Sequence, residues 1–176
     1  MATLHRGVTA LELIIALAIV ALLFAAGVPT ARKLTRNTAL DAAVGQLHSD
    51  LALARNQAIL RGGATVVCPA RQPAGCDAGT HWQAGWLLFQ DFNGDRERQP
   101  AEPLLRHGQP APGVRIQSSA GRTRLRFTPS GAAAGSNVRI AFCAGPEAVP
   151  ARYLFVSNSG RIRTAEAPAD APPECP

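Results

Sequence analysis

Arginine residues dominate the charge of this 176-residue chain, and they are unevenly placed. Seventeen of its 18 basic residues are arginine, and Lys33 is the only lysine. The segment 104–165 holds nine arginines and a single acidic residue, Glu147, whereas the net charge of the whole chain is +6. A guanidinium group can donate two parallel hydrogen bonds to one phosphate. The segment therefore indicates a surface for a polyanion such as a nucleic acid.

Two groups of arginines within this segment have the spacing of one strand face. Arg122, Arg124 and Arg126 alternate along the chain, so a strand would point all three the same way. The sequence Gly160-Arg161-Ile162-Arg163 would present two guanidinium groups side by side after a glycine turn. No aromatic residue alternates with these arginines, which favours contacts with the backbone of duplex DNA over stacking on single-stranded bases. The alternative is a solvated strand face in a protein whose genome favours arginine.

Four cysteines could form either a metal site or disulfides. They are Cys68, Cys76, Cys143 and Cys175. None forms the Cys-x-x-Cys pair that is typical of metal sites, and three disulfide pairings are open. We expect Cys68–Cys76, which would close a loop containing proline and glycine, and Cys143–Cys175, which would hold the C-terminal tail against a strand.

An acidic loop and scattered histidines are the remaining candidates for chemistry. In the loop 91–97, oxygen-bearing side chains alternate as in a calcium loop, but Gly94 comes earlier than in the EF-hand pattern. We favour a turn between strands over a calcium site. The histidines are dispersed along the chain, and Ser130 has no paired base. We therefore expect no enzyme activity, no cofactor and no metal.

The first structural element along the chain is a long apolar run. Residues 8–28 are interrupted by one charge, Glu12, and as a helix they would span about 30 Å, the thickness of a bilayer core. A cleaved signal peptide is the alternative, but the run is too long and lacks a small-x-small cleavage site. A carboxylate in hydrocarbon costs several kcal/mol unless it finds a partner, so Glu12 predicts one.

A second helical pattern follows the apolar run. Apolar residues recur at spacings of 4 and 3, which predicts an amphipathic helix that ends near Arg61, before Gly62-Gly63. They are Leu40, Val44, Leu47, Leu51, Ala54 and Ala58.

Beyond residue 63 the helical period gives way to short apolar runs separated by turn residues. These predict strands at 64–68, 85–90, 114–118, 123–128, 138–143, 153–157 and 161–164, followed by a tail rich in proline and alanine. With 47% hydrophobic and 17% charged residues, the composition excludes chain-wide disorder. The fold class is α+β, a long helix whose apolar stripe is buried by an antiparallel sheet.

The N-terminal residues resemble those of type IV pilins and type II secretion pseudopilins. In that family a prepilin peptidase cuts after a glycine and methylates the new N-terminus, and a glutamate and often a proline stand at fixed positions beyond the cut. Cleavage between Gly7 and Val8 would place Glu12 and Pro29 at those positions, although Val8 replaces the usual phenylalanine or methionine. The resemblance implies that the Glu12 carboxylate faces the amine of Val8 in the same or a neighbouring subunit.

The resemblance also implies a type IV pilin-like fold and a domain organisation. Residues 1–7 would be the leader, 8–28 the membrane and fibre-packing half of the helix, 29–61 its amphipathic half, and 62–176 the globular β-sheet domain. Expected partners are the prepilin peptidase, the inner membrane, the major pilin and other minor pilins. The precursor would span the inner membrane with its globular domain in the periplasm, and the mature subunit would lie in the pilus fibre or tip.

Further motifs are similar to the GspH and FimT branch of this superfamily. They are Trp82-x-x-Gly85-Trp86-Leu-Leu-Phe89-x-Asp91-x-Asn93-Gly94-Asp95, Phe127-x-Pro129-x-Gly131 and Ser159-Gly160-Arg161. The Gly-Arg-x-Arg element resembles the DNA-binding motif of FimT-type minor pilins, which implies DNA contacts by Gly160, Arg161 and Arg163. On the basis of charge alone, we also expect supporting contacts with DNA from four further arginines, Arg122, Arg124, Arg126 and Arg152.

The expected function is therefore that of a FimT-like minor pilin that binds extracellular duplex DNA, without sequence preference, for natural transformation. Two alternatives remain open. One is a structural, FimU-like minor pilin that primes pilus assembly, and the other is a GspH-like minor pseudopilin of type II secretion.

Overall fold

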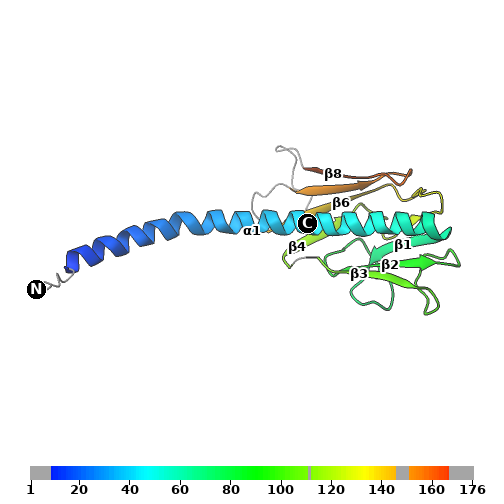
Figure 1. The fold of residues 1–176 in the computed structure, drawn as a ribbon, viewed down its shortest axis with the longest axis horizontal. Coiled ribbons are helices and arrows are strands. Elements are labelled where there is room, and N and C mark those ends of the chain that lie inside the picture. Colours follow the sequence, from blue (N-terminus) through cyan, green and yellow to red (C-terminus); the bar gives the residue numbers. More distant parts are fainter. Residues whose placement is uncertain (1–8, 111, 146–150, 167–176) are drawn as a thin grey trace, which may run out of the picture. The chain divides into compact units, whose positions relative to one another are not determined.

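One helix and eight strands make up the fold (Figure 1). The computed structural model describes residues 9–110, 112–145 and 151–166. The expected cleavage site between Gly7 and Val8, and Cys175, lie outside the described residues. The chain divides into two compact units, Met1–Thr35 and Arg36–Pro176, and helix α1 (Ala10–Arg61) begins in the first and ends in the second.

The first unit consists of the apolar start of α1. Thr9 and Glu12 form a capping box, in which the Glu12 N–H donates to Thr9 Oγ1 at 3.3 Å and the Thr9 N–H to Glu12 Oε2 at 3.5 Å. Large aliphatic side chains of this unit are exposed, Leu22 to 71% of its surface. Among the residues that the structure describes, no helix combines the length and hydropathy needed to cross a membrane.

The second unit is organised around the amphipathic part of α1. The predicted stripe from Leu40 to Ala58 is confirmed, because all six of its side chains are buried. Toward its C-terminus the stripe consists of two small residues, Ala54 and Ala58. The helix ends at Arg61, as predicted, and Gly62 then takes a positive φ of 63°.

The strands form two antiparallel four-stranded sheets rather than the single sheet that the sequence suggested. The first sheet has the order β3-β2-β1-β5, and the second has the order β4-β6-β7-β8. The bounds are β1 Ala64–Pro69, β2 Trp86–Asp91, β3 Leu104–Gly108, β4 Val114–Ser118, β5 Leu125–Phe127, β6 Val138–Ala144, β7 Arg152–Val156 and β8 Ile162–Glu166. Strand β3 is the one that the sequence did not predict, because apolar and polar residues do not alternate along it.

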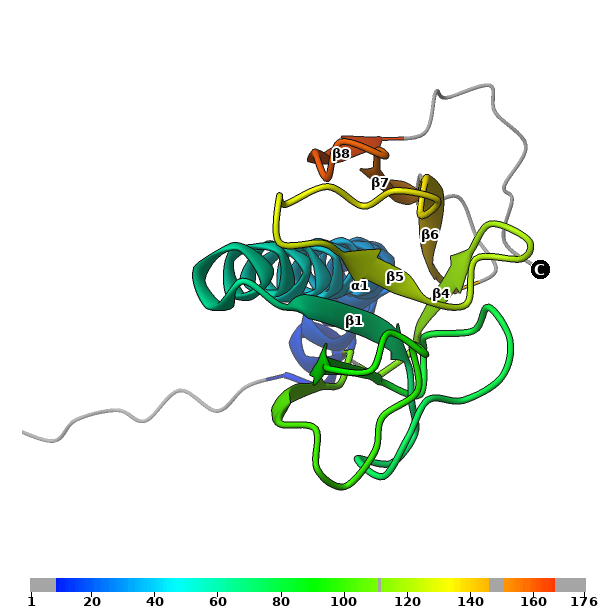
Figure 2. The same cartoon turned by 90° about the vertical axis from the view of Figure 1, so that its right-hand side faces the viewer.

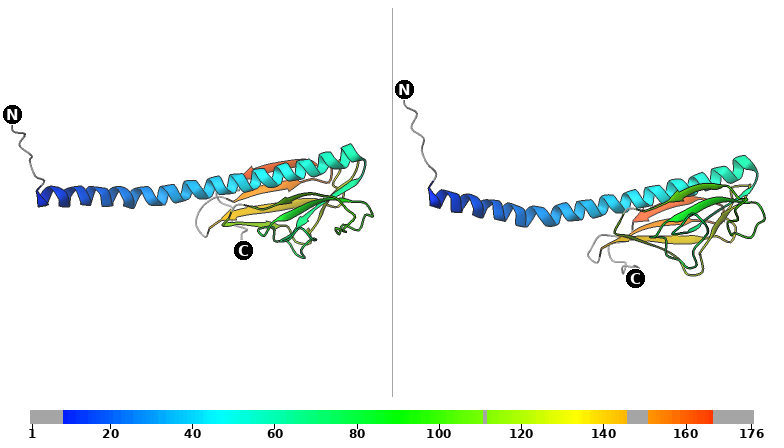
Figure 3. Two further views of the ribbon diagram at one scale, coloured as in Figure 1. Left: turned by 60° about the horizontal axis from the view of Figure 1, so that its bottom comes forward. Right: turned by 90° about the horizontal axis from the view of Figure 1, so that it is seen from below.

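Both sheets pack around the second part of α1. Figure 2, seen nearly along the helix, places β1 below it, β5 beside it and β7 and β8 above it, and the views in Figure 3 show the strands alongside this part of the helix. Inward side chains of both sheets join the helical stripe in one core, including Phe127 and Phe142. We call the side of each sheet that faces away from α1 its outer face.

A buried carboxylate links the helix to the first sheet. Asp50 is only 2% exposed. It accepts a hydrogen bond from Trp86 Nε1 at 2.8 Å and forms an ion pair with Arg106, whose Nε lies 2.8 Å from Oδ1. A buried charge is tolerated only when such donors satisfy it. Nearby, Thr65 Oγ1 donates to the Ala54 carbonyl at 2.8 Å, so three polar contacts fix the helix on β1, β2 and β3.

The disulfide predicted between Cys68 and Cys76 is confirmed, with a Cα–Cα distance of 5.7 Å. It closes the loop that follows β1. Cys143, on β6, is also disulfide-bonded. The partner predicted for it, Cys175, is outside the described residues.

Replacing Asp50 by alanine should lower the free energy of unfolding by about 3 kcal/mol, because Trp86 Nε1 and the Arg106 guanidinium would lose their shared acceptor. Urea denaturation of the full-length protein in a nonionic detergent, followed by circular dichroism, measures this change. Asp41→Ala is the control, since it removes an exposed carboxylate paired with Arg152 and should cost at most about 1 kcal/mol. Equal losses in the two variants would contradict the role of Asp50.

Candidate nucleic-acid interface

Arg161 ends the tight turn between β7 and β8, and Arg163 is the second residue of β8. We call residues 157–161 the β7–β8 turn. The Gly160 N–H donates to the Ser157 carbonyl at 2.8 Å, and the Ser157 N–H donates to the Arg161 carbonyl at 3.0 Å. The Ser157 hydroxyl also accepts from the Arg161 N–H at 3.2 Å. These bonds fix the backbone of the turn while both arginine side chains are exposed to solvent.

Gly160 is required by packing. It is buried, its φ is +77°, and a Cβ at this position would collide with the carbonyl oxygen of Gly131. That same carbonyl accepts a hydrogen bond from Arg55 Nε of α1 at 3.0 Å. The Ala133 N–H donates to the Asn158 carbonyl at 2.9 Å. The β7–β8 turn is thus held against the segment after β5, and Gly160 shapes it without being accessible itself.

An aromatic ring supports each of two arginines on the outer face of the second sheet. Strand register places Arg163 directly opposite Phe155, and Phe155 directly opposite Arg139. The guanidinium carbon of Arg163 lies 4.8 Å from the centre of the Phe155 ring, and that of Arg139 lies 5.7 Å from the Tyr153 ring. Both distances are within the range of cation–π attraction.

These rings correct one expectation from the sequence. Along each strand no aromatic residue alternates with the arginines, but across neighbouring strands the sheet brings them together. Sequence reasoning therefore missed Arg139, Tyr153 and Phe155 as part of this surface. The alternation in Val138-Arg139-Ile140 already placed Arg139 on the outside of its strand, but only the pairing of β6, β7 and β8 reveals its neighbours.

The outer face of the second sheet is exposed at Arg139 and Arg163 and buried at Ala141, Cys143 and Tyr153. The outward positions of its four strands in the described ranges hold no aspartate or glutamate. These positions are Arg115, Gln117, Arg139, Ala141, Cys143, Tyr153, Phe155, Arg163 and Ala165.

The stripe of Arg122, Arg124 and Arg126 has a different environment. Arg124 forms an ion pair with Glu97, and Arg126 Nε lies 3.3 Å from Asp91 Oδ2. Arg122 Nη1 donates to the Gly135 carbonyl at 2.7 Å. All three side chains are half-buried, and they flank or belong to β5, in the first sheet. The structure does not join them with Arg161 and Arg163 in one sheet, so their expected supporting role is not favoured.

Arg152 also differs from the expectation. It lies on β7 with its side chain turned toward α1, where Nε is 3.1 Å from Asp41 Oδ1 and Nη2 is 3.3 Å from Glu166 Oε1. Two carboxylates thus offset its charge, and its side chain is only 16% exposed. Arg152 therefore serves to link β7, β8 and the helix rather than to extend the exposed positive surface.

The acidic loop after β2 uses its carboxylates to bind its own backbone, as a turn between strands would. Asp91 Oδ1 accepts from the Gly94 N–H at 2.8 Å, and Asp95 Oδ1 accepts from the Glu97 N–H at 2.8 Å. The second bond stabilises the ionised form and lowers the pKa of Asp95. Within the described ranges, no group of three acidic, histidine or cysteine side chains could hold a metal ion.

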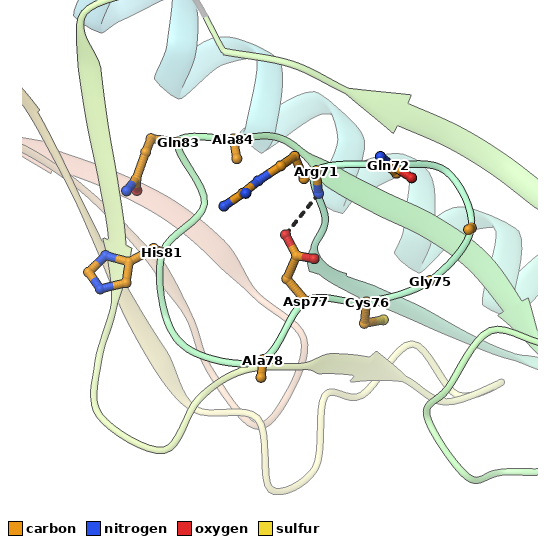
Figure 4. A pocket seen from close by; sticks show the side chains of 10 residues that line it. Arg71, Gln72, Gly75, Cys76, Asp77, Ala78, His81, Gln83 and Ala84 are labelled. Carbon is orange, nitrogen blue, oxygen red and sulfur yellow. Dashed lines mark hydrogen bonds between the residues drawn. The ribbon is translucent and has the colours of Figure 1, made fainter.

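A hollow of about 640 Å³ is lined by the segment between β1 and β2 (Figure 4). Its lining includes Arg71, Asp77 and His81. Asp77 Oδ2 accepts a hydrogen bond from the backbone N–H of Arg71 at 2.9 Å, so this carboxylate shapes the loop. In Figure 4 His81 lies away from Asp77, and the two do not form an acid–base pair.

Comparison with known proteins identifies relatives of this fold. Residues 43–160 match the family described as type II transport protein GspH. Two crystal structures of the type IV minor pilin FimU of Pseudomonas aeruginosa PAO1 align with TM-scores of 0.57 and 0.60 at 20% and 21% identity, covering 77% and 80% of this chain and 98% and 97% of theirs. The minor pseudopilin EpsH of the Vibrio cholerae type 2 secretion system aligns with a TM-score of 0.52 at 13% identity, covering 72% of this chain and 96% of that one. No curated protein matches.

Gly160→Ala should destabilise the domain by about 3 kcal/mol, because the new methyl group meets the Gly131 carbonyl and the backbone keeps a positive φ. Gly121→Ala is the matched control, since its φ is +72° but nothing lies within 4 Å of the added Cβ. It should cost only about 1 to 2 kcal/mol. Urea unfolding of both variants measures the difference, and a Gly160 variant no less stable than the Gly121 variant would refute the close packing of the turn.

Proposed function

The chain belongs to the GspH family, within the type IV pilin and pseudopilin superfamily, and we propose that it is a minor type IV pilin that binds extracellular DNA through its β7–β8 turn. Bound DNA would then be taken up in natural transformation. The proposal rests on the position of Arg161 and Arg163 at the end of the second sheet. Their relation to the Gly-Arg-x-Arg element of FimT-type minor pilins supports the same function.

One observation carries this proposal. In the described part of the chain, the carboxylates that contact arginines of the positive segment pair with arginines other than Arg161 and Arg163. Five arginines between 104 and 165 contact a carboxylate or a backbone carbonyl, namely Arg106, Arg122, Arg124, Arg126 and Arg152. By contrast, within the described part of the chain no carboxylate pairs with Arg161 or Arg163. Their two guanidinium groups, one at the end of the turn and one at the start of β8, suit the phosphate oxygens of a nucleic-acid backbone.

Binding of this kind is expected to have little sequence preference. Guanidinium contacts to phosphate fix a protein on DNA but do not read bases. Each phosphate contact releases bound counterions, so the slope of log affinity against log salt changes by about 0.9 per contact. The salt slope therefore counts the contacts that a variant has lost.

The first unit suggests how the subunit would enter a fibre. Its exposed aliphatic side chains, such as Leu11, Leu22 and Leu23, need an apolar partner, and we propose the inner membrane before assembly and neighbouring pilin helices afterwards. A prepilin peptidase would cut between Gly7 and Val8 and methylate Val8. The Glu12 carboxylate, now in the capping box with Thr9, would then be available to the amine of Val8. The globular domain would face the periplasm before export into the pilus.

A second function is favoured by the description of the matching family. A type II transport protein would be a minor pseudopilin, which contacts other pseudopilins and not DNA. The fold shared with FimU is equally compatible with a minor pilin that primes assembly. Deletion of the gene separates these functions: loss of secretion indicates the pseudopilin, loss of pili the priming subunit, and loss of transformation with pili retained the DNA receptor.

The double variant Arg161→Ala/Arg163→Ala should bind duplex DNA at least tenfold more weakly and lower the salt slope by about 0.9 for each lost contact. Fluorescence anisotropy with a labelled 30-base-pair duplex, titrated with the full-length protein in nonionic detergent at several salt concentrations, measures both quantities. Arg122→Ala/Arg124→Ala is the control that removes the same charge from the first sheet. If the two double variants lose affinity equally, net charge alone explains binding and the assignment to the turn fails.

A further inference from the structure

Two turns of the same construction meet near the end of α1. One is the β7–β8 turn, and the other, which we call the β5 turn, consists of residues 128–132 after β5. In each turn the glycine N–H donates to the carbonyl of the first residue at 2.8 Å, and the hydroxyls of the first and third residues pair at 2.9 Å. The two glycines, Gly131 and Gly160, are buried and have φ values of +76° and +77°. Figure 1 shows both turns at the end of the domain where α1 ends.

Arg55 of α1 lies where these two turns meet. Its Nε donates to the Gly131 carbonyl at 3.0 Å, and an ideal Cβ on Gly160 would lie 3.2 Å from the same Nε. We propose that Arg55 and Arg161 together form a phosphate-binding site at this junction, and that the ligand is a phosphate group of the DNA backbone. This inference rests on the proposed function and extends its site from β8 to the helix.

Most of the Arg55 guanidinium is not used by the fold. A guanidinium group has five N–H donors, and the bond to Gly131 needs one of them. Within the described ranges, the Nη groups of Arg55 have no hydrogen-bond or ion-pair partner, and the side chain is half-buried. A bond to a neutral carbonyl leaves the positive charge uncompensated. The remaining N–H groups therefore suit an anion.

The residues around the junction leave its positive charge without competition. The three segments that meet there, 51–61, 127–136 and 156–164, contain four arginines and no acidic residue. Asp50 precedes the first segment, but its carboxylate is already bound by Trp86 and Arg106. A phosphate would therefore meet no carboxylate of these segments. The four arginines are Arg55, Arg61, Arg161 and Arg163.

The junction also brings Arg55 within reach of the same ligand as Arg161. Since consecutive Cα atoms are about 3.8 Å apart, the Arg161 Cα lies within about 9 Å of Arg55 Nε. Both side chains can therefore contact the backbone of one duplex. The bond from Nε to Gly131 also orders the Arg55 side chain in advance, which lowers the conformational entropy that binding removes.

Arg55→Met tests the additional contact. We expect duplex affinity to fall about three- to tenfold and the salt slope to fall by about 0.9, in the anisotropy titration described above. Arg55→Lys, which keeps the charge and a donor for the Gly131 carbonyl, should retain the slope. Arg71→Met is the control, because it removes the same charge beyond the other end of β1, about 17 Å of strand away from the end of α1. It should leave both quantities nearly unchanged.

A double-mutant cycle separates a phosphate contact from an effect on the β7–β8 turn. Arg55→Met also removes the bond to Gly131, so by itself it could act by displacing Arg161. We therefore add it to the variant Arg161→Ala/Arg163→Ala, in which this indirect effect has no arginine to displace. The triple variant should bind more weakly than the double variant and lose a further 0.9 or so of salt slope. Circular dichroism melting curves verify that each variant folds.

The outcomes distinguish this inference from the function on which it rests. If Arg55→Met has no effect in the double-variant background, Arg55 only positions the turn and the phosphate contact is refuted. If Arg71→Met weakens binding as much as Arg55→Met, net charge explains the loss and the site at the junction is wrong. In both cases the proposed function stands as long as Arg161→Ala/Arg163→Ala weakens binding. If none of these variants changes DNA binding, the proposed function itself is wrong.

Discussion

Burial of the helical stripe from Leu40 to Ala58 is the contact on which the domain depends. It combines inward side chains of both sheets in one core, and it fixes which side of every strand faces outward. Because successive strand residues alternate between faces, a shift of strand register by one residue would exchange the inward and outward side chains. The buried Asp50, held between Trp86 and Arg106, resists such a shift in the first sheet, since any other register would leave a buried charge without donors.

The fixed orientation of the strands also divides the arginines into two classes. Those beside the acidic loop, such as Arg124 and Arg126, form ion pairs with carboxylates from distant parts of the chain. Arg152 points toward the helix and meets two more carboxylates. On the outer face of the second sheet, Arg139 and Arg163 each lie over an aromatic ring. Folding therefore places the arginines of one positive segment in several different environments.

Local patterns were sufficient for much of this fold. The helical stripe, the helix end at Arg61 and the short Cys68–Cys76 loop all follow from residues close in sequence. The division into two sheets, strand β3 and the partners of each arginine depend on contacts between distant residues, which periodicity does not encode. Arg124 illustrates this: its spacing indicated an exposed stripe, but Glu97 approaches it from another loop. The rings under Arg139 and Arg163 were missed for the same reason.

The β7–β8 turn places two different selective constraints on neighbouring residues. Gly160 is fixed by the collision that any side chain would make with Gly131, whatever the chain binds. The side chains of Arg161 and Arg163 are exposed and lie outside the hydrophobic core. During divergence within the family, the glycine is expected to persist for packing while the arginines persist only where a polyanion is bound. The glycine of this motif consequently identifies the architecture, and the two arginines after it carry the information about function.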